Sequence, residues 1–296
     1  MKEQIFTAHD GKELVCTLWD NVTHPIGVVQ IIHGMDEHVR RYDRFAKFLN
    51  RNGYIVFGDD HRAHGKTATS IGRIGKPDGD EDLFAETVTD ELEIIGYLKN
   101  KYHLPVFLFG HSYGSFITQA IMEKTDLCMA GVCLSGTARY PTWILTIARA
   151  IAWIGRTVWG PDAPARFIET FSPIRGSGRL TRDAVQTAKH DADPMRAKYF
   201  SYGFYYSLFS NLMKLHGNAP ADTPLLIISG SRDLVSVNSR LSMALYRKYQ
   251  EHDLQNLTII IYPEARHELL LELNYKDVQN DVLEFLNSIN PNAYAN

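Results

Sequence analysis

The sequence predicts an α/β fold, in which helices cover both faces of a mostly parallel β-sheet and a helical segment is inserted between two of the strands. Three observations support this class. Short continuous apolar runs, typical of strands buried on both faces, alternate with longer segments of helical periodicity. The first two apolar segments flank His9-Asp10-Gly11-Lys12, where Asp-Gly favours an antiparallel hairpin. The alternation stops after residue 135 and resumes at residue 223.

The expected elements follow one another in a regular order. The expected strands cover residues 5–8, 14–18, 26–32, 54–57, 106–109, 131–134, 225–228 and 257–261. The expected helices cover residues 41–52, residues 84–102, a segment that begins at Tyr113, and about 275–286. Gly53 closes the first helix, and the acidic run 78–82 complements the N-terminus of the second. Because parallel strands need crossover connections, this alternation predicts the mostly parallel sheet.

One strand–helix junction carries a candidate nucleophile. The apolar run 106–109 breaks at Gly110, and Ser112 lies between Gly110 and Gly114 just before the next helix. This G-x-S-x-G pattern is typical of a sharp, strained turn that presents a serine hydroxyl beside a helix N-terminus, which favours developing negative charge. The alternative is a chance Gly-Ser-Gly loop, and the strand–turn–helix setting makes it the weaker interpretation.

Two later strand ends carry candidate partners for Ser112. Asp233 lies just past the apolar run 225–228, and His267 lies just past the run 257–261. A serine nucleophile on such a sheet needs first an acid and then a histidine in loops after later strands, which is the order found here. A single aspartate in such a loop is otherwise a turn residue, and a single histidine a surface residue. Position and order together predict a Ser112–Asp233–His267 triad.

Four separated segments together resemble one family. They are His33-Gly-Met-Asp-Glu-His38 with Arg41-Tyr42, Asp60-His-Arg-Ala-His-Gly65, Gly110-His-Ser-Tyr-Gly114, and the loops of Asp233 and His267. On these residues the chain resembles the α/β-hydrolase family of monoacylglycerol lipases and lysophospholipases, also called the serine aminopeptidase S33 group. The resemblance implies the α/β-hydrolase fold and an oxyanion hole formed by the backbone N–H groups of Met35 and Tyr113.

The remaining motif residues are expected to brace these loops through hydrogen bonds. They are His38, Arg41, Asp60, His61, Arg62 and His64. The chain departs from the family at Asp36 and Ala63, where the family commonly has glycine.

The break in the strand pattern predicts the domain organisation. Residues 136–222 follow a strand end, at the sheet edge where open α/β proteins bind ligands. We therefore expect an α/β-hydrolase catalytic core of residues 1–135 and 223–296, with an inserted helical lid, or cap, of residues 136–222. The lid contains Trp143, Trp153 and Trp159, which are candidate substrate-binding residues.

One lid helix allows two interpretations. Between Trp143 and Trp159 the polar side chains keep to one narrow helical stripe. This helix therefore either packs on the core or presents a lipid-facing surface. In both cases an apolar lid suits a substrate with a hydrophobic acyl chain.

Charge is unevenly distributed along the chain. The lid holds eleven Lys or Arg and six Asp or Glu, a net charge of +5, whereas the whole chain carries −3. A basic lid attracts anionic head groups or membrane surfaces, although a solvated charged surface needs no such partner. The overall charge predicts no nucleic-acid partner.

Other functional classes lack their signatures. No metal or organic cofactor is expected, because the sequence contains no HExxH motif and no Cys/His ligand spacing. Cys16, Cys128 and Cys133 are an odd number of cysteines in or beside apolar segments, which predicts buried, reduced thiols. The polar N-terminal segment does not resemble a signal peptide, so we expect a cytoplasmic protein.

These observations predict a serine carboxylic-ester hydrolase acting on a lipid-like ester, monoacylglycerol or lysophospholipid, through an acyl-enzyme. The expected partners are this small-molecule ester and, transiently, a membrane surface. Two enzymatic alternatives stay open. One is an S33-type aminopeptidase, which the positive lid disfavours because the substrate's amine needs carboxylates, and the other is a short-chain or aryl esterase. From another class, the alternative is a non-catalytic ligand-binding protein of the same fold, which need not keep the triad.

Overall fold

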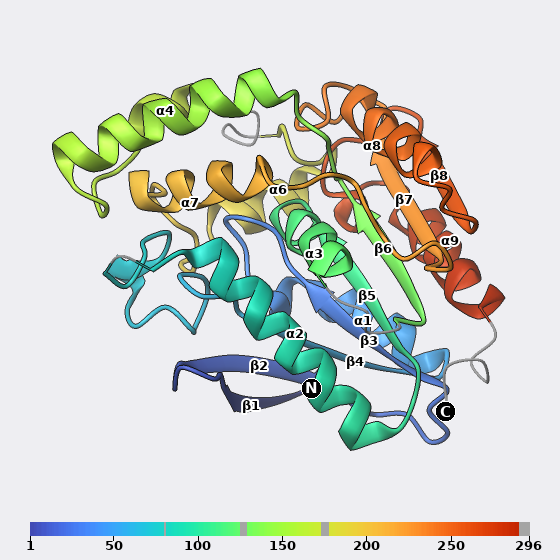
Figure 1. Cartoon of the computed structure of the whole chain (residues 1–296). Coiled ribbons are helices and arrows are strands. Elements are labelled where there is room, and N and C mark those ends of the chain that lie inside the picture. Colours follow the sequence, from blue (N-terminus) through green and yellow to red (C-terminus); the bar gives the residue numbers. More distant parts are fainter. Residues whose placement is uncertain (80, 125–128, 173–177, 290–296) are drawn as a thin grey trace.

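The strands of the chain form one sheet. The computed structural model describes residues 1–79, 81–124, 129–172 and 178–289. The strands are β1 (Lys2–Thr7), β2 (Glu13–Trp19), β3 (Gly27–Ile32), β4 (Tyr54–Asp59), β5 (Val106–His111), β6 (Gly131–Ser135), β7 (Leu225–Gly230) and β8 (Leu257–Tyr262). Their order across the sheet is β1-β2-β4-β3-β5-β6-β7-β8. The first two strands form the predicted antiparallel hairpin, β2 pairs antiparallel with β4, and every pair from β4 to β8 is parallel (Figure 1). The predicted mostly parallel sheet is confirmed.

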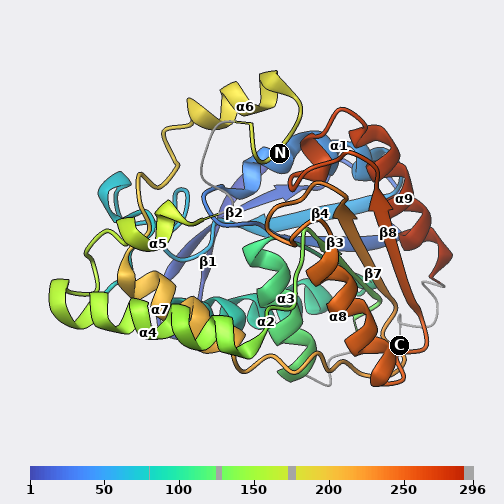
Figure 2. The same ribbon diagram turned by 90° about the horizontal axis from the view of Figure 1, so that it is seen from above.

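Helices cover both faces of this sheet. The α-helices are α1 (Asp43–Arg51), α2 (Leu83–Tyr102), α3 (Tyr113–Lys124), α4 (Thr142–Trp159), α5 (Arg166–Thr170), α6 (Ala184–Asp191), α7 (Tyr202–Leu212), α8 (Arg240–Glu251) and α9 (Tyr275–Ser288). The described residues also form the short 3₁₀ helices η1 (Val39–Tyr42), η2 (Ile71–Arg73) and η3 (Leu269–Leu271). Viewed from above, α1 and α9 lie on one face of the sheet, and α2, α3 and α8 lie on the other (Figure 2). Each face therefore has its own hydrophobic core.

The central strand β5 shows why these strands appear as continuous apolar runs. Successive strand side chains point to opposite faces of a sheet. Phe107 and Phe109 therefore enter the core beneath α1 and α9, whereas Val106 and Leu108 enter the core beneath α2, α3 and α8. Burying each side chain of this size contributes about 1.5–3 kcal/mol. Because β5 is anchored on both faces, the residue that follows it, Ser112, is held in a fixed position.

Residues 136–222 lie between β6 and β7. Their described part holds α4 to α7 and no strand, apart from an isolated bridge between Pro164 and Ser201. Helix α4 lies along α7, away from the sheet (Figure 1). Of its residues only Leu145, Ala152 and Gly155 are buried, and a Cβ at Gly155 would lie 2.2 Å from the ring of Tyr202. Helix α4 therefore lies closely against α7, and its Leu145 and Ala152 join the hydrophobic core on that side of the sheet.

Two further sequence expectations concern the cysteine thiols and membrane-spanning helices. Cys16 and Cys133 are buried free thiols, as predicted, and burial raises the pKa of both. Cys128 lies outside the described residues. Within the described ranges, no helix combines the length and the apolar character needed to cross a membrane.

Candidate active site

Ser112 lies in a strained turn between β5 and α3. Its φ is 51°, in the left-handed region that residues with a Cβ rarely adopt. The flanking glycines permit the turn, because a Cβ at Gly114 would lie 2.0 Å from the carbonyl oxygen of Ile32, and one at Gly110 would lie 2.2 Å from Thr118 Oγ1. The backbone N–H of Ser112 donates to the carbonyl of Ser135 at the end of β6, at 2.9 Å. Two strands and a helix therefore fix the hydroxyl.

His267 and Asp233 meet Ser112 at this edge of the sheet. His267 Nε2 lies 2.7 Å from Ser112 Oγ, and His267 Nδ1 lies 3.0 Å from Asp233 Oδ1. Asp233 follows β7, His267 follows β8, and both side chains are buried. The sequence thus brings together three residues separated by up to 155 positions.

The charges of this pair are mutually stabilised. Burial lowers the pKa of His267, but the adjacent Asp233 carboxylate outweighs burial and leaves that pKa above its ordinary value. Burial raises the pKa of Asp233, but His267 and the Val235 N–H outweigh it and leave the pKa lowered. The acid is therefore ionised, and it favours the protonated form of the imidazole.

Two backbone N–H groups flank Ser112 without an acceptor. They belong to Met35, which follows β3, and to Tyr113, the first residue of α3. No described residue accepts a hydrogen bond from either group. Gly34 is close to the nucleophile, because a Cβ built on it would lie 3.2 Å from Ser112 Cβ. These are the two donors that the resemblance implied, and their role as an oxyanion hole stays a prediction.

A buried histidine pair supports the turn that precedes Met35. The rings of His33 and His61 stack with centroids 3.8 Å apart. The N–H of His61 donates to His33 Nε2 at 3.0 Å, and His33 Nδ1 lies 2.8 Å from the carbonyl oxygen of Gly34. His61 Nε2 in turn lies 3.2 Å from the carbonyl oxygen of His33. His61 therefore braces the loop, as expected for a motif residue.

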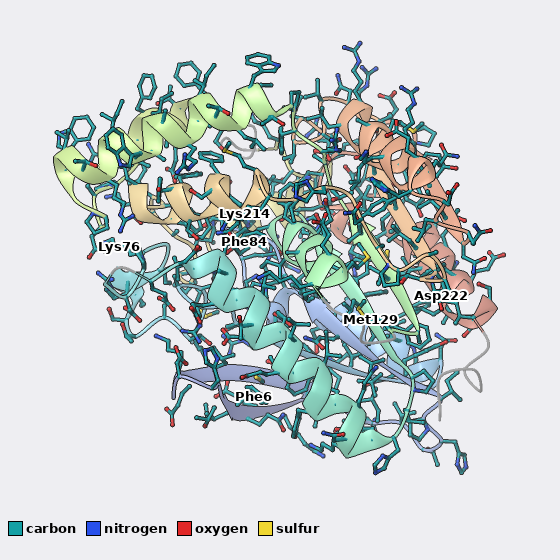
Figure 3. The ribbon with its side chains drawn as sticks, in the orientation of Figure 1. Phe6, Lys76, Phe84, Met129, Lys214 and Asp222 are labelled. Atoms are coloured by element: carbon teal, nitrogen blue, oxygen red, sulfur yellow. The ribbon has the colours of Figure 1, made fainter. Side chains whose placement is uncertain are left out.

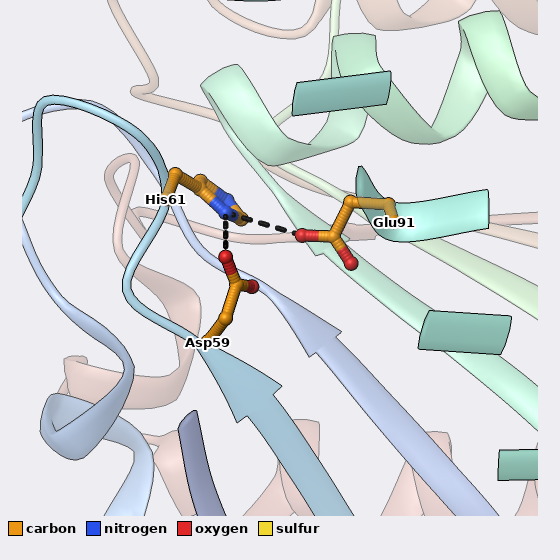
Figure 4. A group of neighbouring side chains, drawn as sticks. All are labelled: Asp59, His61 and Glu91. Atoms are coloured by element: carbon orange, nitrogen blue, oxygen red, sulfur yellow. Dashed lines mark hydrogen bonds and ion pairs between the residues drawn. The ribbon is translucent and has the colours of Figure 1, made fainter. Parts of the chain in front are cut away.

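His61 belongs to a cluster that sequence spacing did not reveal. Its Nδ1 lies 3.3 Å from Asp59 Oδ2 and 3.1 Å from Glu91 Oε1, and all three side chains are fully buried (Figure 4). Burial lowers the pKa of His61, but Asp59 raises it well above its ordinary value, so the ring is an imidazolium. Burial and the neighbouring Asp59 raise the pKa of Glu91 to about 8. A charged His61–Asp59 pair beside a protonated Glu91 accounts for the contacts at His61 Nδ1, while Asp59 Oδ1 accepts no hydrogen bond from a described residue.

The same three side chains also have the composition of a metal site. They offer one nitrogen and two oxygen ligands, all within 4.8 Å of one another. Sequence spacing did not indicate this cluster, because its side chains come from β4, from the loop after it and from α2 rather than from one short motif. Protons account for the arrangement without a cation, since the imidazolium neutralises one carboxylate.

The two departures from the family occupy left-handed backbone positions. Asp36 has a φ of 64° and Ala63 a φ of 60°, which explains why glycine is common there. The Asp36 carboxylate accepts hydrogen bonds that a glycine at this position could not accept. Arg196 donates to its Oδ2 from Nη2 at 2.8 Å and from Nε at 3.0 Å, and the N–H of Ala197 donates to its Oδ1 at 2.9 Å.

Further contacts join the same two segments. His38 Nε2 lies 2.9 Å from Asp193 Oδ2, and Arg40 donates to the sulfur of Met195. We call these contacts, together with those of Asp36, the clasp between residues 36–40 and residues 193–197. The clasp fastens the loop that carries Met35 to the insertion.

The three lid tryptophans lie apart from the buried serine. Their exposed fractions are 66% for Trp143, 54% for Trp153 and 63% for Trp159. Side chains project outward along α4 (Figure 3). Two cations of the polar stripe contact α7: Arg149, itself exposed, donates to Tyr206 and Ser210, and the guanidinium of Arg156 lies over the Tyr206 ring. The structure therefore does not gather these tryptophans around Ser112.

A narrow polar cavity lies beside His111, whose ring centroid is 4.9 Å from that of His267. Its volume is about 20 Å³, room for about one water molecule, and its lining includes Glu37, Arg41, His111 and Glu268. Arg41 bridges the two glutamates, at 3.1 Å from Glu37 and 2.9 Å from Glu268. Glu37 also accepts from the N–H of Gly34, which ties this ion-pair network to the Met35 loop.

Comparisons with known proteins identify the family. A family model described as serine aminopeptidase, S33 matches residues 23–274. A monoacylglycerol lipase of Mycolicibacterium smegmatis is 30% identical over 290 residues, covering 96% of each chain. A monoglyceride lipase homolog of monkeypox virus is 28% identical over 284 residues, covering 93% of each. A carboxyl esterase from Bacillus coagulans, crystallised with glycerol, superposes with a TM-score of 0.84 at 24% identity, covering 97% of this chain and 98% of the esterase, which shows a shared fold. The chain therefore belongs to the serine aminopeptidase S33 family of α/β hydrolases.

Proposed function

We propose that the chain hydrolyses lipid-like carboxylic esters, with monoacylglycerols as the first candidate substrates, through an acyl-enzyme on Ser112. The observation that carries this proposal is the continuous contact from Ser112 Oγ through His267 to Asp233, beside two N–H groups without acceptors. The matched relatives include monoacylglycerol and monoglyceride lipases, which supports an ester of this kind.

In this mechanism each residue has a distinct role. His267 Nε2 takes the proton of Ser112 Oγ as the oxygen attacks the ester carbonyl, and Asp233 stabilises the imidazolium that forms. The N–H groups of Met35 and Tyr113 donate to the oxyanion, where one such donor contributes on the order of 10²–10³ in rate. The imidazolium then protonates the leaving alcohol. Water attacks the acyl-enzyme by the same route and releases the fatty acid.

The paired carboxylates that line the polar cavity favour an ester substrate over a peptide with a free amine. An aminopeptidase needs a carboxylate to hold the substrate's ammonium group. Apart from Asp233, the carboxylates that act on His267 are those of Glu268 and Glu37, and Arg41 already bridges them. Burial raises the pKa of Glu268, but Arg41 outweighs burial and lowers it to about 2, so this carboxylate is ionised and paired. Neither is available to a cationic substrate.

The outer face of α4 supports transient contact with a lipid surface. Exposed apolar side chains gather on it, and Phe167 and Phe171 beside α5 are also more than half exposed. The exposed large hydrophobic residues of α4 are Trp143, Ile144, Ile147, Trp153, Ile154, Val158 and Trp159. Tryptophan prefers the boundary between head groups and acyl chains, so this face suits a membrane that holds the substrate. The insertion would then act as the predicted lid, and the cytoplasmic location stays a prediction from the sequence.

Initial rates across a substrate panel test this function. The panel contains monoacylglycerols, lysophospholipids, short aryl esters and aminoacyl anilides. We expect the highest specificity constants for the long-chain esters and no turnover of the anilides. Rapid hydrolysis of the anilides would favour the aminopeptidase alternative. Higher specificity constants for the short aryl esters than for the long-chain esters would contradict the proposal that the substrate is a lipid-like ester. Trp153→Gln and Trp159→Gln should weaken binding to phosphatidylcholine vesicles without changing hydrolysis of a soluble ester.

A further inference from the structure

A fully buried carboxyl in helix α2 contacts the histidine that braces the Met35 loop. Glu91 Oε1 lies 3.1 Å from His61 Nδ1, nearer than Asp59 Oδ2 at 3.3 Å (Figure 4). The other carboxyl oxygen of Glu91 accepts a hydrogen bond from Gln30 Nε2, which also lies 3.3 Å from the backbone carbonyl oxygen of Glu91. Gln30 belongs to β3, the strand that leads into the Met35 loop. Glu91 therefore joins α2 to this strand and to His61.

Stability alone gives no reason for a carboxyl at this position. Glu91 and Asp59 are both withdrawn from water, which costs free energy that their contacts must offset. The contacts are incomplete, because Asp59 Oδ1 and Gln30 Oε1 accept no hydrogen bond from a described residue. A hydrophobic residue at position 91 would avoid this cost.

The contacts of His61 determine where its ring carries protons. Its Nδ1 faces the Asp59 carboxylate, and its Nε2 lies 3.2 Å from the carbonyl oxygen of His33. Both of these groups can only accept hydrogen bonds, so both ring nitrogens donate and the ring is a cation. With both sides of the ring held, its orientation is fixed.

His61 in turn determines the tautomer of His33. The backbone N–H of His61 donates to His33 Nε2 at 3.0 Å, so this nitrogen carries no proton. Burial and the neighbouring charge of His61 lower the pKa of His33 well below its ordinary value, so its ring is neutral. The single proton of the ring therefore lies on Nδ1, which donates to the carbonyl oxygen of Gly34 at 2.8 Å.

The carbonyl of Gly34 and the N–H of Met35 belong to one peptide unit. Because such a unit is planar and trans, its carbonyl and its N–H point in opposite directions. The hydrogen bond from His33 Nδ1 therefore also orients the N–H of Met35, which has no acceptor among the described residues. Rotation of this peptide would turn the donor away from an oxygen that becomes negatively charged at Ser112.

We propose that Glu91 is a positioning residue for the oxyanion hole, and that it acts through His61 and His33 on the direction of the Met35 N–H. This inference rests on the proposed ester hydrolysis and adds to it a residue that lies outside the four segments resembling the family. Because a donor to the oxyanion acts mainly in the transition state, losing Glu91 should slow turnover and leave ester binding nearly unchanged.

The test replaces Glu91 by leucine, which has a similar size but no hydrogen-bond acceptor. We expect Glu91→Leu to lower kcat on a soluble ester by about tenfold, with KM changed by less than about twofold. This loss is smaller than the factor on the order of 10²–10³ for deleting an oxyanion donor, because Asp59 still holds His61. Glu93→Leu is the matched control, since Glu93 lies in the same helix but is 32% exposed and pairs with His9.

Glu91→Gln tests whether the contact with His61 carries the effect. Burial and the neighbouring Asp59 raise the pKa of Glu91 to about 8, so a neutral amide resembles its protonated form. The new amide oxygen can accept from His61, and rotation of the Gln30 amide lets its Oε1 accept from the new NH₂ group. We expect kcat to stay within about threefold of the wild type. A glutamine variant as slow as Glu91→Leu, a folded Glu91→Leu with wild-type kcat, or an equal loss in Glu93→Leu would overturn the proposal.

Two ligands measure the oxyanion hole without turnover. A trifluoromethyl ketone with the acyl chain of the substrate adds to Ser112 and forms a tetrahedral oxyanion, whereas the corresponding methyl ketone stays trigonal. Calorimetry should show that Glu91→Leu weakens binding of the fluorinated ketone by about the factor lost in kcat and leaves the methyl ketone unchanged. Equal weakening of both ketones would indicate general damage to the site and would overturn the proposed role.

Nitrogen NMR of the imidazole rings tests the chain of contacts in the wild type. We expect His33 to carry one proton, on Nδ1, and His61 to carry protons on both nitrogens. A proton on His33 Nε2, or a neutral His61, would overturn the proposal. Neither the ketone titrations nor the NMR spectrum requires ester turnover. A wild type that hydrolyses no ester would therefore end the proposed function, while these measurements would still test the role of Glu91.

Discussion

Replacing Asp36 by glycine should slow catalysis although glycine suits the backbone there. The φ of 64° means that Asp36→Gly removes strain rather than adding it, so any loss comes from the missing carboxylate. That carboxylate accepts two hydrogen bonds from Arg196 and one from the N–H of Ala197. The Asp36 side chain is 7% exposed and that of Arg196 21%, so the pair is partly screened.

The size of the effect follows from the position of Met35. Breaking a fully buried pair costs about 3–5 kcal/mol, and the partial exposure of Arg196 reduces this to about 1–3 kcal/mol of stability. Met35 is adjacent to Asp36, and a misplacement of about 1 Å in an active site can cost on the order of 10² in rate. We therefore expect Asp36→Gly to lower kcat by roughly 10- to 100-fold, with KM changed little because the donor acts mainly in the transition state.

The assay is a double-mutant cycle with Arg196→Met, using kcat on a soluble ester and the melting temperature. The two substitutions should be strongly non-additive, since each removes the same contact. Asp191→Asn is the matched control, because Asp191 lies 3.1 Å from Arg196 Nη1 but is 47% exposed, and exposed pairs contribute only about 0–1 kcal/mol. Wild-type kcat in Asp36→Gly, or additive losses in the cycle, would refute the claim that the clasp positions Met35.

Two further predictions concern protons and metals. His267 must be neutral to accept the proton of Ser112, and its pKa is raised, so kcat/KM should fall as the pH drops through a value above the ordinary 6.5. Asp233→Asn should move this acid limb to lower pH and cut kcat on the order of 10⁴-fold, and an unmoved limb would assign the carboxylate role elsewhere. Dialysis against EDTA should leave both activity and melting temperature unchanged, because protons balance the Asp59–His61–Glu91 cluster. One equivalent of metal per chain, whose removal lowers the melting temperature, would contradict that assignment.

The sequence could predict the parts of the site that lie within one short segment or that depend on the order of residues along the chain. The apolar run of β5, the break at Gly110 and the helical pattern after Ser112 lie within a short stretch, so their pattern specifies the turn directly. Asp233 and His267 were identified because each follows a strand end in the required order.

The parts that sequence could not predict depend on contacts between distant segments. Arg196 is 160 residues from Asp36, and nothing in the local pattern of either indicates the other. Glu91 occupies an ordinary helical position in α2, and only the fold brings it to His61. Helix α4 shows a different limit. Its periodicity identified the polar stripe, but not that Arg149 and Arg156 contact Tyr206 of α7 while large apolar side chains of the same helix stay exposed.

The central claim is that Ser112 forms the acyl-enzyme, and intact-protein mass spectrometry tests it most directly. A fluorophosphonate probe should add one tag per chain in the wild type, and none in Ser112→Ala, because the reagent reacts with a serine activated as Ser112 is by His267 at 2.7 Å. His267→Ala should label far more slowly while keeping the nucleophile in place. Undiminished labelling of Ser112→Ala would contradict the account, because the activated hydroxyl would then belong to another residue.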